Sequence, residues 1–591
     1  MEMRVPQRLA VLLLAALFLP MIRAASAQEK EAPLPGIAER FPPGTIGLIR
    51  LNRMDHFGAW LEKSPLAAMV KDPEVKPLWD AANALARRYA KQAEDQVGVN
   101  LLDMLGRIRG EIAIGLTTVR IARPPAPGLL LAVDCGDGAE AFRRDLDRLL
   151  ERVPAKAFRR VTREVKGCPI EVFSPVRAEG RRNPLNVLGP VHLAWVGSVL
   201  VAGNDKAGLD RFVQVSLGEK LPLLGETENY RDTIARLGGA GDLTMYVNIR
   251  AISEVLEAAV GAMPENVGPV ITALGLDQFP ALGSSTFLRD DAATGRFILR
   301  YTGDRKTGLG SLLAFKNTTL SVPAWVPEDA WQVMILNYDF QGAFDGLLGM
   351  VHDAGEEPYE DLEEGMERFY QRFGLSLRDD LLGALANPVV LVRLPPVGNE
   401  PLLAVPGGGL PYASMGGQGP ILFGVRIRNR KPIEQMIEVQ EGMGAQVTEY
   451  LGATIVSPPT FSEDQPIMEF AVTDTHVLFG MSMNSIVRRT LQRMGGRESG
   501  FAGQEGVRDA VAGLPREGVG LFVYDYGRAI ATGLNVLKVA TAVTDRVDIL
   551  AKIPIPSASV LEKYLGHAAA VMTFEPGVGV IFDSSFRFRR K

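Results

Sequence analysis

The sequence is poor in the residues and motifs on which most enzyme sites depend. It contains 2 cysteines and 5 histidines in 591 residues. Two cysteines exclude a disulfide-scaffold fold and a multi-cysteine zinc or iron–sulfur cluster. The chain also has no G-x-S-x-G, S-x-x-K or H-E-x-x-H motif and no phosphate-binding glycine loop. We therefore assign no catalytic, cofactor-binding or metal-binding residue from sequence, and we expect no cofactor.

The histidines are too scattered to suggest a local catalytic centre. No histidine lies within ten residues of another, and the five positions are His56, His192, His352, His476 and His567. A nucleophilic hydrolase needs a base positioned beside its nucleophile, and histidine is the usual base. A hydrolase would therefore need a site assembled from distant residues, whereas histidines that pack in strands or lie on the surface are the simpler interpretation.

The two cysteines lie at the ends of predicted strands. Cys135 ends the strand GLLLAVDC (128–135), and Cys168 begins the strand CPIEVF (168–173). If these strands are neighbours, a possible disulfide between Cys135 and Cys168 would contribute about 3 kcal/mol by restricting the unfolded chain. Two buried, unpaired thiols are the alternative, and the sequence leaves both open.

The first 27 residues have the pattern of a secretory signal. Arg4 and Arg8 precede an apolar run of 14 residues (9–22), and Ala25-Ser26-Ala27 forms an A-x-A cleavage site. The run contains Pro20 and is shorter than the roughly 20 residues that a membrane span needs, although an uncleaved anchor is the alternative. We expect a periplasmic or secreted protein with no membrane span after signal cleavage.

Charge and composition argue for a globular protein that does not bind nucleic acid. Removal of residues 1–27 would change the formal charge from −5 to −7, and the sequence pI is near 5.8. A nucleic-acid-binding chain is expected to be basic. Basic residues do gather between 143 and 182, where they could bind an anionic partner or simply occupy solvent-facing positions. The acidic run 356–364 lacks the spacing of a calcium loop and suits the start of a helix.

The same pattern of about 270 residues occurs twice after this signal, which is within ordinary domain size. Segment 41–61 resembles segment 326–348, and segment 229–252 resembles segment 506–530. Predicted hairpins also recur, with Lys166-Gly167 and Leu451-Gly452 at their turns. We interpret the chain as an internally duplicated protein.

The predicted organisation follows from these landmarks. It comprises a signal peptide (1–27), a leader (28–40), a first repeat (41–305), a linker (306–319) and a second repeat (320–591). Strands interspersed with single helices and direct hairpins predict two tandem α+β halves with largely antiparallel sheets. The halves could fold as separate units or pair about a pseudo-two-fold axis as one body, and the sequence does not decide between these arrangements.

The opening of the first repeat resembles a family of exported bacterial proteins that carry a domain of unknown function. The resemblance rests on Pro43-Gly44-Thr45 with the strand that follows, on the segment 64–80, and on the strand–helix unit 128–146. The second repeat departs from this pattern and opens with Pro327-Glu328-Asp329. The resemblance implies an exported α+β protein and transfers no catalytic residue.

Three functional hypotheses follow. The first is a non-catalytic scaffold or binding protein of the cell envelope, with an unidentified envelope protein or ligand as partner. Its binding elements would be the loops 175–190 and 403–420, because long irregular segments on a rigid body often carry function. The second is an envelope hydrolase with a non-contiguous active site. The third is a chaperone-like envelope-assembly module, which an exposed apolar surface would favour.

Overall fold

The computed structural model describes most of the chain between residues 36 and 589. The described ranges are 36–120, 126–152, 158–176, 189–260, 267–303, 307–313, 315–395, 420–457, 467–482, 485–494, 500–531, 534 and 555–589. The predicted signal segment 1–27 lies outside the described residues. The predicted binding loops 175–190 and 403–420 lie largely outside them, so both remain predictions.

The described residues form an α+β fold, as predicted, with one large antiparallel sheet of 20 strands. The first ten strands are β1 (Gly47–Leu51), β2 (Ile112–Arg120), β3 (Ala126–Asp134), β4 (Phe158–Val165), β5 (Cys168–Pro175), β6 (Val191–Val196), β7 (Val199–Gly203), β8 (Leu243–Asn248), β9 (Ala281–Arg289) and β10 (Ala292–Arg300). The other ten are β12 (Gln332–Leu336), β13 (Leu385–Arg393), β14 (Ile421–Ile427), β15 (Gln446–Tyr450), β16 (Ala453–Ser457), β17 (Ile467–Val472), β18 (His476–Ser482), β20 (Gly520–Asp525), β21 (Leu565–Glu575) and β22 (Gly579–Phe588). A separate two-stranded pair joins β11 (Thr318–Thr319) to β19 (Glu517–Gly518).

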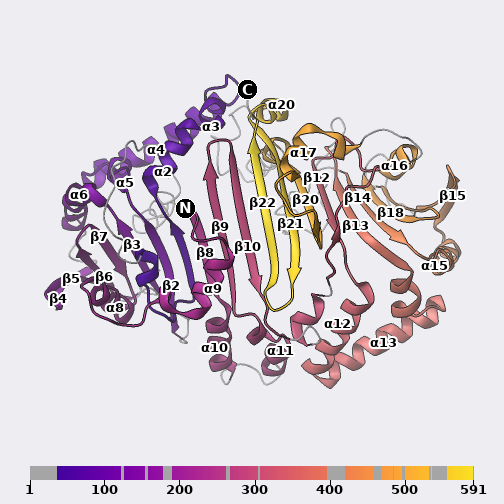
Figure 1. Cartoon of the computed structure of the whole chain (residues 1–591), viewed down its shortest axis with the longest axis horizontal. Coiled ribbons are helices and arrows are strands. Elements are labelled where there is room, and N and C mark those ends of the chain that lie inside the picture. The colour runs from indigo at the N-terminus through magenta and orange to yellow at the C-terminus, as the bar shows by residue number, and fades with distance from the viewer. Residues whose placement is uncertain are drawn as a thin grey trace.

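Strand pairing places the two halves in a single sheet that runs across the width of the molecule (Figure 1). The first half contributes the order β4-β5-β6-β7-β3-β2-β1-β8-β9-β10. The second half continues as β22-β21-β20-β12-β13-β14-β18-β17-β16-β15. The β10–β22 pair joins the halves, so they form one body rather than two separate units.

The pairing order of the second half reproduces that of the first in reverse along the sheet. One line of direct Cα partners crosses all of these strands, and it meets Arg163 on β4 and Thr448 on β15 at the two edges. Each of these residues lies three positions before the first residue of its hairpin turn, Lys166 or Leu451. Equivalent strands therefore agree in register as well as in order. Descent from a doubled ancestral unit remains a prediction that this regularity supports.

The two hairpin turns confirm the prediction for these segments. Lys166 and Leu451 have φ angles of 52° and 51°, and the glycines that follow, Gly167 and Gly452, both have φ of 78°. Two successive residues with positive φ are the geometry that matches the right-handed twist of paired strands. Glycine adopts this conformation freely, whereas lysine and leucine adopt it at some cost in strain.

Helices cover one face of the sheet and line its two ends. Those of the first half are η1 (Ile37–Arg40), α2 (Met54–Lys63), α3 (Pro65–Met69), α4 (Lys76–Val97), α5 (Leu101–Leu105), η2 (Gly136–Gly138), α6 (Ala139–Glu151), α8 (Lys206–Ser216), η3 (Leu224–Glu226), α9 (Glu228–Arg236), α10 (Ile249–Val260), α11 (Val267–Ala273) and η4 (Leu276–Gln278). Those after it are η5 (Gly308–Leu312), α12 (Phe340–Ala354), α13 (Glu356–Phe373), the π-helical turn η6 (Leu377–Leu382), α15 (Lys431–Gly442), α16 (Ile486–Met494), η7 (Phe501–Gly503), α17 (Glu505–Val511) and α20 (Ala558–Glu562). Figure 1 shows α10 to α13 along one end of the strands and α2 to α5 along the other.

The main cores of the two halves lie on the same face of the sheet. Ala113 and Ala132 belong to the core of the first half, and Ile335 and Val390 belong to that of the second. These residues lie on the single line of Cα partners, and directly paired residues point to the same face. Helices α8 and α9 pack on this covered face in the first half, and α16 and α17 do so in the second. On the opposite face, α6 packs in the first half and α15 packs in the second, each in a smaller apolar cluster. The remaining part of that face, which these helices leave exposed, is the open face.

The final residues of the predicted leader belong to the fold. Ile37 and Ala38 are buried in η1, and their backbone N–H groups donate hydrogen bonds of 3.1 and 2.8 Å to the carboxylate of Glu111. Arg50 Nε lies 3.1 Å from the same carboxylate. A buried carboxylate needs such donors for its hydrogen bonds, so these contacts tie residues 37 and 38 to strand β1 and to Glu111. The domain boundaries remain predictions.

No described helix combines the length and the apolar character that crossing a membrane requires.

Candidate functional site

The open face of the sheet exposes large apolar side chains in two clusters. The first cluster lies on strands β3, β1 and β8, and the second on β14, β18 and β17. The first comprises Leu129, Ile49, Leu243 and Met245, and the second comprises Phe423, Phe479 and Met468.

Register shows that two pairs of these side chains are direct neighbours, whereas strand β2 lies between Leu129 and Ile49. Ile49 is directly opposite Met245, and the two are 45% and 39% exposed. Phe423 is directly opposite Phe479, and these are 39% and 40% exposed. Paired side chains on one face lie within about 5.5 Å of each other, so each pair presents a continuous apolar surface.

The two apolar clusters share one face of one rigid sheet. A line of Cα partners runs from Leu243 on β8 through Gly295 and Ser584 to Phe423 on β14. Eight strand-to-strand steps of about 4.8 Å place the clusters roughly 40 Å apart. Between the clusters, the line passes the small residues Gly295 and Ser584 and then the half-buried side chains of Phe522, Met334 and Leu391. The clusters differ from this centre in the exposure of their large apolar side chains.

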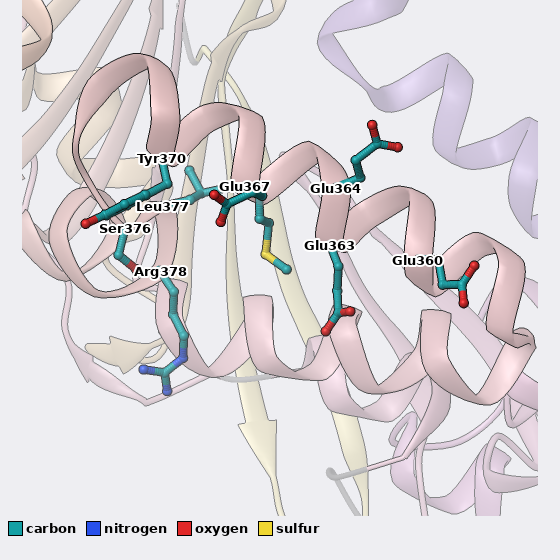
Figure 2. A pocket seen from close by; sticks show the side chains of 9 residues that line it. Glu360, Glu363, Glu364, Glu367, Tyr370, Ser376, Leu377 and Arg378 are labelled. Carbon is teal, nitrogen blue, oxygen red and sulfur yellow. The ribbon is translucent and has the colours of Figure 1, made fainter.

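A shallow groove with a volume of about 670 Å³ lies along α13. Figure 2 shows Glu360, Glu363, Glu364 and Glu367 projecting from this helix, with Arg378 below them. The guanidinium of Arg378 binds Asp345 and Asp379, so its charge does not neutralise the glutamates. The same contact lowers the pKa of Asp345.

The groove is lined in part by the acidic run 356–364, which the sequence analysis placed at the start of a helix. Helix α13 starts at Glu356, and Glu356 and Glu357 occupy its first turn. Negative side chains at this end of a helix interact favourably with the helix dipole. Among the described residues, no group of three or more His, Cys, Asp or Glu side chains has the arrangement of a metal site. The groove is therefore a negatively charged surface feature with an ordinary electrostatic explanation.

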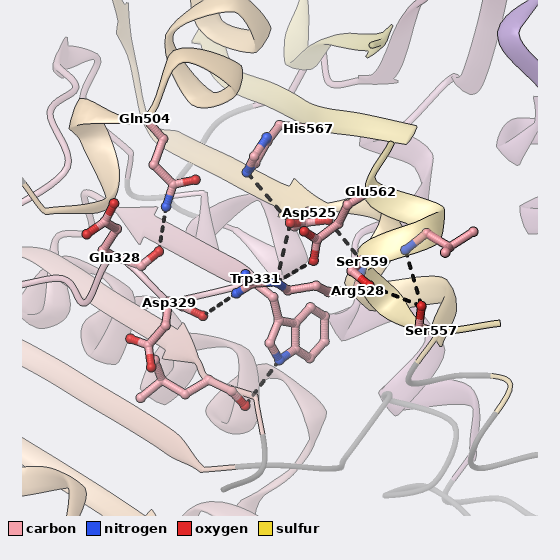
Figure 3. Close-up of polar contacts among 12 residues, drawn as sticks. Glu328, Asp329, Trp331, Gln504, Asp525, Arg528, Ser557, Ser559, Glu562 and His567 are labelled. Carbon is pink, nitrogen blue, oxygen red and sulfur yellow. Dashed lines mark hydrogen bonds and ion pairs between the residues drawn. The ribbon is translucent and has the colours of Figure 1, made fainter. Parts of the chain in front are cut away.

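A polar cluster, comprising Asp525, Arg528, Glu562 and His567, lies at the end of β20 and β21 (Figure 3). Asp525 and His567 are buried, and Arg528 and Glu562 are partly exposed. Asp525 and His567 are directly opposite in the sheet, and Nε2 of His567 is 4.0 Å from Oδ2 of Asp525. Arg528 donates from Nε to Oε1 of Glu562 at 2.7 Å and from its backbone N–H to Oδ1 of Asp525 at 3.1 Å. Burial raises the pKa of Asp525 and lowers that of His567.

Sequence analysis missed this polar cluster, because no spacing in the sequence joins its members. The sequence contained only a local indication of this cluster, which is the position of Asp525 and His567 in apolar strands. Asp525 ends the apolar strand GLFVYD, and His567 lies in a strand of small and apolar residues. A charged or titratable residue inside such a strand indicates a partner, but only the fold identifies which one.

The strands that carry the cysteines are not neighbours, so the condition for the predicted disulfide fails. Strands β7 and β6 lie between β3 and β5 in the sheet. Both thiols are buried and free. The thiol of Cys168 donates to the carbonyl of Trp195 at 3.3 Å, and burial raises the pKa of Cys135 to about 12. Three strand steps separate the two cysteine-bearing strands by roughly 14 Å, well beyond disulfide reach.

The five histidines occupy five separate environments. His56 Nδ1 lies 2.9 Å from Oδ1 of Asp242 at a half-exposed position, and His352 is exposed beside Asp353. His192 contacts Arg163, His476 contacts Thr475, and His567 belongs to the polar cluster. The groove along α13 contains no histidine. The hydroxyl of Thr475 does lie 2.8 Å from Nδ1 of His476, but in the described part of the chain no carboxylate pairs with that histidine to orient it. These contacts therefore assign the hydrolase hypothesis no site.

Several residues of the predicted basic region are paired with acidic residues. Arg160 binds Glu171, Arg163 binds Asp210, and Lys166 binds Glu219. These ion pairs reduce the positive field that an anionic partner would meet.

Comparison with known proteins gives no further evidence about identity. No protein-family model, no curated protein and no solved structure matches this chain.

Proposed function

We propose that this chain is an exported, non-catalytic binding protein of the cell envelope, and that a folded partner protein docks on the open face of its sheet. The observation that carries the proposal is the direct pairing of exposed apolar side chains on that face, Ile49 with Met245 and Phe423 with Phe479. Contiguous exposed apolar surface is the usual mark of an interaction site.

The shape of the surface favours a protein over a small ligand. Small-molecule sites are concave and enclose most of their ligand. The two apolar clusters instead lie on an open sheet face about 40 Å apart, a separation set by the strand spacing. A folded partner can contact both clusters at once, and methionine side chains such as Met245 and Met468 adapt to the surface that they meet.

Export is a separate part of the proposal and rests on the pattern of residues 1–27. We expect these residues to direct a reporter enzyme without its own signal to the periplasm. Retention of that fusion in the cytoplasm would contradict the localisation without affecting the docking surface.

The docking surface can be tested in cells with two double variants, Ile49→Ser with Met245→Ser and Phe423→Ser with Phe479→Ser. Cross-linking of the full-length protein, followed by purification and identification of the attached protein, measures the interaction. We expect each double variant to reduce recovery of the same partner by at least tenfold, which corresponds to about 1.4 kcal/mol.

The matched control is Leu217→Ser with Val270→Ser, because these side chains are 46% and 45% exposed but lie outside the sheet. This control should retain the partner. Equal recovery from every variant would refute the docking surface. Recovery of many unfolded proteins instead of one folded partner would favour the chaperone-like hypothesis.

A further inference from the structure

Helix α20 is a point of contact between the two halves outside the β10–β22 pair. The side chain and the backbone N–H of Ser557, just before the helix, donate to the carboxylate of Glu74 at 2.8 and 3.2 Å. The hydroxyl of Tyr564, just after the helix, donates to Asp72 at 2.9 Å. Val560 is buried in an apolar cluster that includes side chains from the first half. The position of α20 therefore determines how α2 to α4 dock against the second half.

The polar cluster of Asp525, Arg528, Glu562 and His567 holds this helix from the other side. Glu562 is the last residue of α20, and its carboxylate accepts the 2.7 Å hydrogen bond from Arg528. Arg528 also donates to the carbonyl of Asp329 at 2.8 Å and lies 3.6 Å from Asp525. Asp525 in turn accepts from the backbone N–H of Arg528 and faces His567. Three contacts in series, from His567 to Asp525, from Asp525 to Arg528 and from Arg528 to Glu562, thus join His567 to α20.

His567 has surroundings that accommodate only its neutral form. The side chain is 2% exposed, and Nδ1 has no hydrogen-bond partner among the described residues. Gly506 of α17 packs so closely that a Cβ atom there would lie 2.5 Å from Nδ1. A neutral ring can direct Nε2–H toward Asp525 and leave Nδ1 unprotonated. A protonated ring would carry a second buried N–H without an acceptor, which is costly.

The charged groups around His567 belong to four segments. Asp525 lies on β20, Arg528 follows it, Glu562 lies on α20, and Arg589 follows β22. The two arginines oppose a positive charge on the ring, and the two carboxylates favour it. Burial is the largest influence and opposes the charged form, so the pKa of His567 falls below its ordinary value.

We propose that Asp525, Arg528, Glu562 and His567 form a proton-sensitive latch that seats α20 against the first half at neutral pH and releases it in mild acid. In the seated state His567 is neutral and Asp525 is ionised beside Arg528. In the released state the strand ends around His567 are hydrated, the ring accepts a proton from solvent, and the Arg528–Glu562 contact that holds α20 is lost.

The direction of the pH dependence follows from proton linkage. A histidine whose pKa is lowered in the seated state contributes stability that is complete above its ordinary pKa, and this stability is lost as the pH falls below that value. Asp525 acts in the opposite direction, because its raised pKa makes the seated state take up a proton more readily in acid. With the ordinary pKa of about 6.5 for His567 in the released state, release can increase by at most about tenfold between pH 7.5 and pH 5.5.

The test places a reporter thiol on α20 of the full-length protein. Val560→Cys introduces a thiol at a position that is 2% exposed, and the native thiols are buried. Its labelling rate is divided by that of Leu217→Cys, an exposed site, at each pH to remove the effect of thiol ionisation. We expect the normalised rate to rise from pH 7.5 to pH 5.5, by up to about tenfold.

Adding His567→Gln to the reporter should abolish the rise, whereas adding His352→Gln at an exposed position should leave it unchanged. A pH-independent rate in the reporter protein, or a rise that persists with His567→Gln, overturns the latch. If His567→Gln does not fold, the histidine NMR signals of the unaltered protein decide the question. A His567 ring that titrates near 6.5 in the folded state would exclude the mechanism, and one that stays neutral at pH 5.5 supports it.

Discussion

The ion pair between Arg296 and Asp583 lies at the centre of the sheet and gives a direct test of how the halves are joined. Arg296 on β10 is directly opposite Asp583 on β22, and its Nε donates to the aspartate Oδ1 at 2.6 Å. Both residues lie on the line of Cα partners that crosses the sheet, each on the tenth strand of its half. A pairing of two identical halves would place like charges opposite each other here, whereas this pairing places opposite charges together.

The magnitude follows from burial and geometry. The side chains are 40% and 20% exposed, so solvent screens the pair less than it screens a surface pair. A hydrogen bond to a charged group contributes about 1.5–3 kcal/mol, and exposed ion pairs contribute about 0–1 kcal/mol. For this partly exposed pair we expect a coupling free energy of about 1–2 kcal/mol.

The assay is a double-mutant cycle with Arg296→Gln, Asp583→Asn and the combined variant, followed by chemical denaturation. Each single variant should lower the free energy of unfolding, and the combined variant should lower it by less than the sum. The control cycle uses Arg368 and Glu364 on α13, which are 63% and 69% exposed and should couple by less than about 0.5 kcal/mol. Additivity at the central pair within about 0.3 kcal/mol would refute the reasoning.

Three further predictions test local features. Gly506→Ala should destabilise the protein by about 1–3 kcal/mol in denaturant, because its Cβ would press on His567, whereas Gly513→Ala, which has no neighbour within 4 Å, should not. Leu451→Asn should raise the free energy of unfolding by up to about 1 kcal/mol, because asparagine tolerates the positive φ of that hairpin turn, and an unchanged or lower midpoint would contradict this. Both cysteines should resist a thiol reagent in the folded protein and react fully after unfolding, and an intact mass two hydrogens short would instead indicate a disulfide.

Local patterns in the sequence predicted the parts of the fold that depend on neighbours along the chain. The α+β class and the two hairpin turns at Lys166-Gly167 and Leu451-Gly452 are confirmed. A hairpin is closed by a few residues whose preferences are visible in the sequence, and an amphipathic helix shows its buried stripe in the same way. The packing of residues 37–40 into the fold was not predicted, because the hydrogen-bond partner of that segment, Glu111, lies more than 70 residues away.

The candidate site also depends on long-range contacts that the sequence does not reveal. Exposure of Ile49 and Phe423 could not be predicted, because alternation assigns an apolar residue to a face of a strand but does not say whether anything covers that face. The sequence left the choice between a disulfide and two free thiols open for a related reason, since it gives the order of strands along the chain and not their order in the sheet. Export, the docking partner and the resemblance to exported bacterial proteins remain predictions.

The sequence by itself determined the α+β class, the hairpins and the order of elements, since each depends on side-chain preferences over a few residues. Only the tertiary structure decided that the halves share one sheet through β10 and β22, that part of one face of this sheet stays exposed, and that Asp525 meets His567. These outcomes depend on which of many competing strand edges pair, a choice made by the free energy of the whole packed chain.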